Sequence, residues 1–237
     1  MSSIPEAVDA LAAALDVLGA ADWGGLEGGD RVDLLDRLET CARRQRAVSH
    51  AVIHGLDQAE LGAPVAVVVA DVLRISRTEA RRRERDAEQL APRTSLTGQP
   101  LPPVLPATAA AWAAGVLDPD HLRTIQKFMR ELPDHIGPGV VEDSDALLAE
   151  KAALLRPDQL EMVADRLAIT VNPDGVFSDE DRARKRGFVW CGRQRPDGMS
   201  VGKLFATPEL RAMFEAWCAK FAAPGMCNPE DLSLIHI

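Results

Sequence analysis

The chain has 237 residues, of which 46% are hydrophobic and 4% aromatic, with no Tyr, and it carries a formal net charge of −9. This length and hydrophobic content allow a buried core in one large or two small domains, which excludes a disordered tail. Ala and Leu are abundant, a usage that favours close-packed helices over a sandwich of large strand residues. We therefore expect a mainly α fold, a multi-helix bundle.

The cysteines and the hydrophobic pattern indicate a compartment. The four cysteines are dispersed, with no Cys-x-x-Cys pair and no dense framework, and they are Cys41, Cys191, Cys218 and Cys227. Such thiols are expected to be free or buried in a reducing environment. No basic region precedes the N-terminal apolar patches, and no apolar run approaches the roughly 20 residues of a membrane span. We expect a cytoplasmic protein that does not contact a membrane.

The N-terminal third predicts four helices in succession. Hydrophobic residues recur at helical spacing over 4–18, and a longer helix is expected from about 30 to 56. A short apolar helix over 64–73 leads to Ser76 and Glu79, a capping box that predicts a further helix to about residue 90. On the long helix, the residues expected to share the packed side are Leu34, Leu38, Cys41, Val48 and Val52. We interpret 1–91 as an N-terminal helical subdomain.

Positive charge is concentrated in two segments, 74–86 with a net charge of +3 and 182–195 with +6. Since an acidic remainder repels a polyanion from the other faces, this segregation favours local anion binding, although two solvated faces give the same pattern. The candidate DNA-contacting residues are Arg77, Arg81, Arg82, Arg83, Arg85, Arg184, Lys185 and Arg186.

The first basic segment has two interpretations. A helix, a tight turn and a capped, arginine-rich helix form the outline of a helix-turn-helix unit, whose second helix meets a major groove. Glu84, Asp86 and Glu88 interleave with the arginines, however, which is equally typical of a solvent-facing helix with i,i+4 ion pairs. Both remain open at the level of sequence.

The C-terminal part predicts more helices and one hairpin. Five prolines in 91–106 predict an extended connector or a boundary between subdomains. The helices expected next cover about 107–114, 118–132 and 140–155, followed by one that begins behind Pro157. A β-rich run, a turn signature and a returning strand predict a hairpin over about 187–206. A final helix, 207–221, has a broad apolar face that the hairpin or a partner chain must cover. We interpret 107–231 as a second helical subdomain.

No catalytic or metal-binding constellation is found. His50 and His54 stand four apart, as two ligands of one metal do, but no third ligand is identifiable, and they are interpreted as surface or packed histidines. His121 is expected to pack or hydrogen-bond near the start of its helix, and Asp145 to stand at a helix start where the dipole favours acids. We expect no catalytic residue, no metal ligand and no cofactor in this chain.

Several segments together resemble the actinobacterial Domain of Unknown Function 222, the thirteen-E-twelve repeat proteins. The likeness covers most of residues 1–231, and its motifs lie at 93–98, 101–108, 114–115, 118–121, 195–199 and 223–229. Members of that family commonly continue into a C-terminal HNH endonuclease module. The resemblance therefore implies a metal-dependent phosphodiesterase in full-length relatives, in which a His activates water and a divalent ion stabilises the charge on the phosphate.

This sequence departs from that pattern, because it contains no HNH core. The divalent metal is expected only for the missing module, and the apolar residues 232–237 are expected to be a truncated or non-native tail. Our leading hypothesis is an N-terminal helical region of an HNH endonuclease-like protein that binds DNA or assembles the protein, without nuclease activity of its own. The alternative is a protein-interaction scaffold whose 207–221 helix docks a partner or a second copy.

Overall fold

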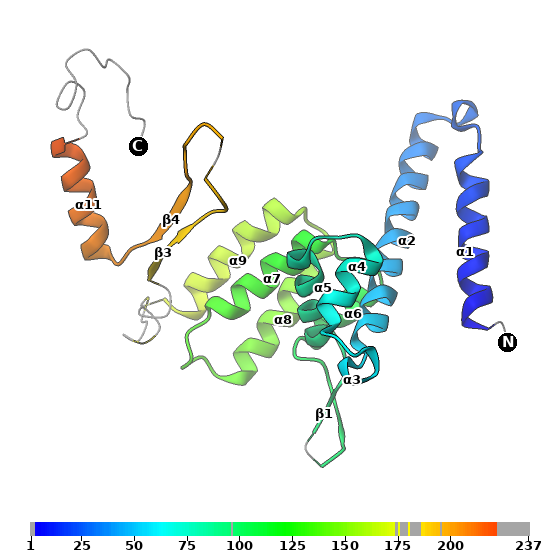
Figure 1. Cartoon of the computed structure of the whole chain (residues 1–237), viewed down its shortest axis with the longest axis horizontal. Coiled ribbons are helices and arrows are strands. Elements are labelled where there is room, and N and C mark those ends of the chain that lie inside the picture. The colour runs from blue at the N-terminus through cyan, green and yellow to red at the C-terminus, as the bar shows by residue number, and fades with distance from the viewer. Residues whose placement is uncertain are drawn as a thin grey trace. The chain divides into compact units, whose positions relative to one another are not determined.

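The computed structural model describes residues 3–95, 97–173, 175, 180, 186–194 and 196–221 (Figure 1). The chain divides into two compact units, one of residues 1–131 and 137–168, the other of 132–136 and 169–237. The proline-rich segment 91–106 lies inside the first unit. The described residues are mainly helical, as the sequence predicts, with most of the helices in the first unit.

The predicted helices up to residue 171 are confirmed to within a few residues. They are α1 (Ile4–Gly19), α2 (Gly28–His54), α4 (Val65–Leu73), α5 (Arg77–Leu90), α6 (Pro106–Ala113), α7 (Pro119–Glu131), α8 (Pro138–Ala152) and α9 (Pro157–Val171). Two short elements were not predicted, the 3₁₀ turn η1 (Trp23–Gly25) and the helix α3 (Gln58–Leu61). The proline-rich segment is not wholly irregular. It holds a short antiparallel hairpin of β1 (Arg93–Thr94) and β2 (Pro100–Leu101).

Helices α2, α4 and α5 enclose one hydrophobic cluster. Helix α5 contributes only Ala80 and Ala87, because the rest of this helix is almost entirely charged or polar. Small side chains let the backbones approach closely, so a helix with little apolar surface can still be anchored on two neighbours. The buried members of the cluster are Ile53, Val65, Ala66, Val69, Ala70, Ala80 and Ala87.

The packed side of α2 differs from the predicted stripe. Val48 and Val52 are 64% and 61% exposed, whereas His50 and Ile53 are buried. The prediction that Val48 and Val52 face the core is therefore wrong. The physical reason is the neighbour: α6 presents the ring of Trp112 to this part of α2, and that ring stacks on His50.

A buried carboxylate holds the start of α6. Asp145, inside α8, accepts the backbone N–H of Ala107 at 2.8 Å, the backbone N–H of Thr108 at 3.3 Å and the Thr108 hydroxyl. The first N–H groups of a helix have no partner within the helix, so a carboxylate at this place satisfies them. The expectation that Asp145 stands at the start of its own helix is wrong, because it lies in the middle of α8 and caps α6.

The end of α6 is as closely defined as its start. Gly115 has a φ of +77°, its N–H donates to the carbonyl of Trp112, and the N–H of Val116 donates to the carbonyl of Ala111. This is a Schellman motif, which favours Gly at the left-handed position. A Cβ at Gly115 would stand 2.5 Å from Cγ of Arg44, so only Gly allows α6 to approach α2 this closely.

The start of α7 is fixed by His121, as the sequence suggests. The Asp118 side chain accepts the N–H of Asp120 at 2.9 Å, while Nδ1 of His121 accepts the N–H of Asp118 at 3.1 Å. Nε2 of His121 then donates to the carbonyl oxygen of Leu155 at 2.8 Å. The two bonds define the tautomer of His121 and tie α7 to the segment after α8.

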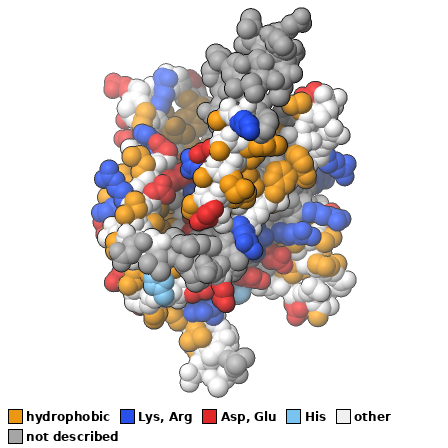
Figure 2. Space-filling view, turned by 90° about the vertical axis from the view of Figure 1, so that its left-hand side faces the viewer, with side chains coloured by type: hydrophobic (Ala, Val, Ile, Leu, Met, Phe, Trp, Pro, Cys, Tyr) orange, Lys and Arg blue, Asp and Glu red, His pale blue; other side chains and the backbone are white. Residues whose placement is uncertain are grey.

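In the second unit, the predicted hairpin is confirmed. Strands β3 (Gly187–Trp190) and β4 (Gly202–Phe205) pair antiparallel, and α11 (Pro208–Phe221) follows. The apolar face of α11 is exposed at Leu210, Met213, Phe214 and Trp217. On the face drawn in Figure 2, hydrophobic side chains lie at the surface between basic and acidic ones. The expected tail, 232–237, lies outside the described residues.

Among the described residues, no helix combines the length and the apolar character that a bilayer crossing needs. Cys41, Cys191 and Cys218 are free thiols.

We predict that Asp145→Ala lowers the free energy of unfolding by about 2–4 kcal/mol, because it leaves buried donors of α6 without an acceptor. Urea unfolding followed by circular dichroism measures this. The matched control is Asp143→Ala, an exposed carboxylate on the same helix, which should change stability by less than about 0.5 kcal/mol. Equal effects of the two changes would contradict the capping role.

Candidate functional site

Helix α5 begins at a turn and carries two different arginine faces. The N-cap Ser76 accepts the N–H of Glu79 at 3.1 Å, which is the half of the predicted capping box that forms. The Glu79 carboxylate turns instead to Arg82, at 2.8 Å, and to Arg83, at 2.9 Å. At about 100° per residue, Arg83 lies on the opposite side of α5 from Arg81, and Arg82 lies on the flank, about 60° from Arg85.

The outer face of α5 holds three of the predicted DNA-contacting residues. Arg77, Arg81 and Arg85 follow one another at intervals of four, are exposed, and have no ion pair with a described residue. We call these three the outer arginines. Arg186 is also exposed, just before β3, while Arg184 and Lys185 lie outside the described residues.

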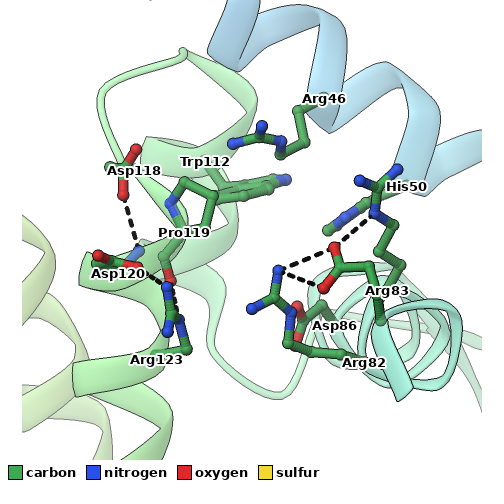
Figure 3. Close-up of a pocket in the computed structure, with 11 residues that line it drawn as sticks. Arg46, His50, Arg82, Arg83, Asp86, Trp112, Asp118, Pro119, Asp120 and Arg123 are labelled. Carbon is green, nitrogen blue, oxygen red and sulfur yellow. Dashed lines mark hydrogen bonds and ion pairs between the residues drawn. The ribbon is translucent and has the colours of Figure 1, made fainter. Parts of the chain in front are cut away.

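The inner face of α5 lines a pocket of about 200 Å³, which we call the arginine pocket (Figure 3). Four helices contribute to it. The positively charged residues of its lining are Arg46 from α2, Arg82 and Arg83 from α5, and Arg123 from α7. The acidic ones are Glu79, Asp86, Asp118 and Asp120. The sequence analysis listed Arg82 and Arg83 as DNA-contacting candidates together with the outer arginines. In the structure, Arg82 and Arg83 line the pocket, whereas the outer arginines do not.

Two stacked rings form a wall of the arginine pocket. The rings of His50 and Trp112 are 5.2 Å apart between centroids and inclined by 26°. Both residues also line a second pocket of similar size, which is mainly apolar and rich in Ala. His50 Nδ1 and Trp112 Nε1 are buried and have no hydrogen-bond partner among the described residues. Such groups are rare in folded proteins, and they call for an explanation.

The pocket keeps His50 uncharged. Burial lowers the pKa of His50 from 6.5 to about 4, and the charges of Arg83, Arg46 and Arg82 add to this shift, while Glu79 opposes it. The imidazole is therefore neutral at neutral pH, and the potential at its position is positive.

The acidic groups respond to the same surroundings in opposite ways. Partial burial acts to raise the pKa of Glu79, but the hydrogen bonds and charges of Arg83 and Arg82 outweigh it, and the net pKa is lowered. Burial raises the pKa of Asp86, against a hydrogen bond from Gln126 of α7 at 2.9 Å. Gln126 also donates to Gln89, so this amide joins α7 to the inner face of α5.

Sequence reasoning missed half of this pocket. Arg46, Trp112 and Arg123 were not singled out, because no local pattern connects residues that are tens of positions apart. One signal existed: the motif at 118–121, which carries part of the family resemblance, provides Asp118, Pro119 and Asp120 of the pocket lining.

The lining of the arginine pocket supplies charged and hydrogen-bonding side chains. No Ser, Thr or Cys lies in its lining, so it offers no conventional nucleophile beside His50. In the described part of the chain, no three His, Cys, Asp or Glu side chains gather where they could hold a metal ion. His50 and His54 share no such group.

Comparison with known proteins places the chain in a family without an assigned role. Residues 32–234 match the family described as Domain of unknown function (DUF222). An uncharacterized protein of Mycobacterium tuberculosis (strain CDC 1551) is 43% identical over 232 residues, which are 96% of this chain and 55% of that protein. A second from M. tuberculosis (strain H37Rv) is 48% identical over 202 residues, 84% of this chain and 44% of that protein.

An uncharacterized protein of Mycobacterium bovis is 44% identical over 232 residues, 96% of this chain and 51% of that protein. The chain thus spans about half the length of these relatives. No solved structure matches it.

We predict that His50 makes stability depend on pH. Above pH 6.5 both the folded and the unfolded chain hold a neutral imidazole; between 6.5 and about 4 only the unfolded chain takes up the proton. The free energy of unfolding should therefore fall as pH decreases, by about 2 kcal/mol at about pH 5. Urea unfolding at several pH values measures it, with His50→Gln as the comparison, in which this contribution is absent. Parallel pH profiles of the two proteins would contradict the prediction.

Proposed function

Because the chain belongs to the family described as Domain of unknown function (DUF222) and spans about half the length of its relatives, we propose that it is the DNA-contacting N-terminal region of a longer protein. The observation that carries this proposal is the outer face of α5. Its three arginines stand side by side, exposed and without an acidic partner among the described residues.

The local architecture supports contact with a DNA backbone. Helix α4 ends at Leu73, the turn 74–76 includes Arg74 in the left-handed conformation, and α5 begins at Arg77. A second helix that follows a tight turn and exposes basic residues at its start has the outline of a helix-turn-helix unit, which supports the proposal. The N-terminal end of α5 also carries the positive end of its helix dipole, which favours a phosphate.

The acids on α5 limit where this contact lies. Glu84 and Glu88 are on the same side as the outer arginines by helical angle, but both come after Arg77 and Arg81 in the chain. A DNA phosphate is therefore favoured near the first two turns of α5. Arg186, Arg184 and Lys185 would supply a second basic segment.

A nuclease role belongs, in this proposal, to the remainder of the full-length protein. The resemblance to HNH endonuclease-associated proteins implies that a divalent metal is held there, where it would stabilise charge on the cleaved phosphate. The described residues provide no cluster for it. The free thiols are compatible with a cytoplasmic location.

We predict that changing Arg77, Arg81 and Arg85 together to Gln lowers the slope of log affinity against log salt by about 2–3, since each lost phosphate contact removes about 0.9. Fluorescence anisotropy with a labelled DNA duplex over a salt series measures the slope.

The control for this experiment is a triple change of equal charge elsewhere, Arg37, Arg130 and Lys203 to Gln, all of them exposed. It should leave the slope nearly unchanged. An equal decrease of the slope in both triple variants would show that DNA responds to net charge and not to a defined face of α5. Absence of DNA binding at low salt would contradict the DNA role.

The alternative function, assembly through α11, is favoured by one observation. Met213 and Trp217 are 71% and 62% exposed, and Leu210 and Phe214 lie on the same side. Large apolar side chains gathered on one helix face are typical of an interface. The occupant in this proposal is a second copy of the chain, which would place two α11 helices face to face in a symmetric pair.

We predict that, if α11 assembles the protein, the native chain has the mass of a dimer by size-exclusion chromatography with light scattering, and Trp217→Asp has that of a monomer. A charge at the centre of an apolar interface cannot be solvated there. Ala212→Asp, an exposed position on the opposite side of α11, should leave the dimer intact. A monomeric native chain would exclude this alternative.

A further inference from the structure

Two buried nitrogen atoms in the wall of the arginine pocket lack a hydrogen-bond partner among the described residues. Trp112 and His50 are each 4% exposed, and neither Nε1 of Trp112 nor Nδ1 of His50 has a hydrogen-bond partner among the described residues. An indole N–H can only donate, so only an acceptor atom satisfies it. A neutral imidazole can donate as well, through whichever nitrogen carries its proton. A ligand that satisfies the indole N–H of this wall therefore has to bring an acceptor atom.

The cations of the pocket come from different directions. Arg46 reaches it from α2, Arg82 from α5 and Arg123 from α7 (Figure 3). Arg82 and Arg83 share the single carboxylate of Glu79. Arg46 has no ion pair with a described residue, so its guanidinium keeps donors for a ligand.

The acids of the pocket are already engaged. Asp118 accepts the N–H of Asp120, Asp120 pairs with Arg123, and Asp86 accepts from Gln126. Glu79 holds two arginines. A cationic ligand would have to displace these contacts, whereas an anionic one can use the donors that are unpaired or only partly used. The four arginines and four carboxylates of the lining balance in charge, so it is the unused hydrogen-bond donors that favour an anion.

We propose that the arginine pocket is a binding site for a phosphate group, free or as a monoester. The tetrahedral oxygens of phosphate accept donors from several directions, as Arg46, Arg82 and Arg123 supply them, whereas a planar carboxylate is best held by the fork of one arginine. The volume of about 200 Å³ accommodates the phosphate with a small attached group.

This site goes beyond the proposed DNA contact and is separable from it. The pocket arginines line the cavity and the outer arginines do not, so a variant of one set leaves the other set in place. A native chain that binds DNA but not phosphate overturns the pocket proposal alone, and one that binds phosphate but not DNA overturns the DNA proposal alone.

The test is a titration of the full chain with inorganic phosphate at constant ionic strength. The indole N–H signals of the four Trp are followed by ¹H–¹⁵N NMR, and Trp112→Phe identifies the signal of Trp112. We expect a saturable shift of that signal while the others stay in place. Arg46→Gln and Arg123→Gln should each weaken binding about tenfold. Arg130→Gln, an exposed control on α7, should not weaken it.

A second readout is independent of tryptophan. A bound anion favours the imidazolium, so the pKa of His50, followed by NMR of its ring, should rise from about 4 when phosphate is added. The proposal is overturned if millimolar phosphate causes no saturable shift of Trp112, if chloride causes the same shift, or if Arg130→Gln weakens binding as much as Arg46→Gln.

The source of the phosphate is decided by comparing two short single-stranded oligonucleotides, one with a 5′-phosphate and one without. Binding at Trp112 of the phosphorylated strand that is tighter than that of the unphosphorylated strand and of inorganic phosphate assigns the site to a nucleic-acid end. Equal or tighter binding of inorganic phosphate assigns it to a small phosphorylated compound. Either result supports the phosphate site.

Discussion

The buried carboxylate of Asp145 determines where α6 begins, and α6 carries the aromatic wall of the arginine pocket. Three donors at the start of α6 converge on this one side chain from α8. At the other end, Gly115 stops the helix and lets it approach α2. These two constraints fix both ends of α6, and in this position its Trp112 ring stacks on His50. The cap that Asp145 forms on α6 therefore stabilises the fold and also positions Trp112 in the pocket wall.

The rotation of helix α5 about its axis is set by contacts of two alanines, although most of the helix is charged. Only Ala80 and Ala87 enter the hydrophobic cluster, and their closeness to α2 and α4 sets the rotation of α5. Since successive residues turn by about 100°, this rotation sends Arg82 and Arg83 inward and leaves Arg81 outside. One basic sequence therefore yields two surfaces with different electrostatics, an open one and one enclosed beside carboxylates.

The arginine pocket combines features that cost stability without a ligand. The indole N–H of Trp112, buried without an acceptor, opposes folding, and the histidine held neutral by burial and by positive neighbours does so below about pH 6.5. Proteins tend to keep such groups where they bind something, since the interior otherwise satisfies its polar atoms. The second, apolar pocket on the same His50–Trp112 wall extends the space available near this site.

The sequence by itself determined the elements whose signals are local. Ser76, Asp118 and Gly115 mark helix ends through hydrogen bonds that span a few residues, and the turn before Gly198 marks the hairpin, so these were predictable. Only the tertiary structure decided which side of α2 is packed and that Asp145 serves another helix. It also decided that residues of α2, α5, α6 and α7 form one pocket. The physical reason is that hydrophobic spacing shows which faces can be buried, whereas the neighbour that buries them is set by packing between segments distant in the chain.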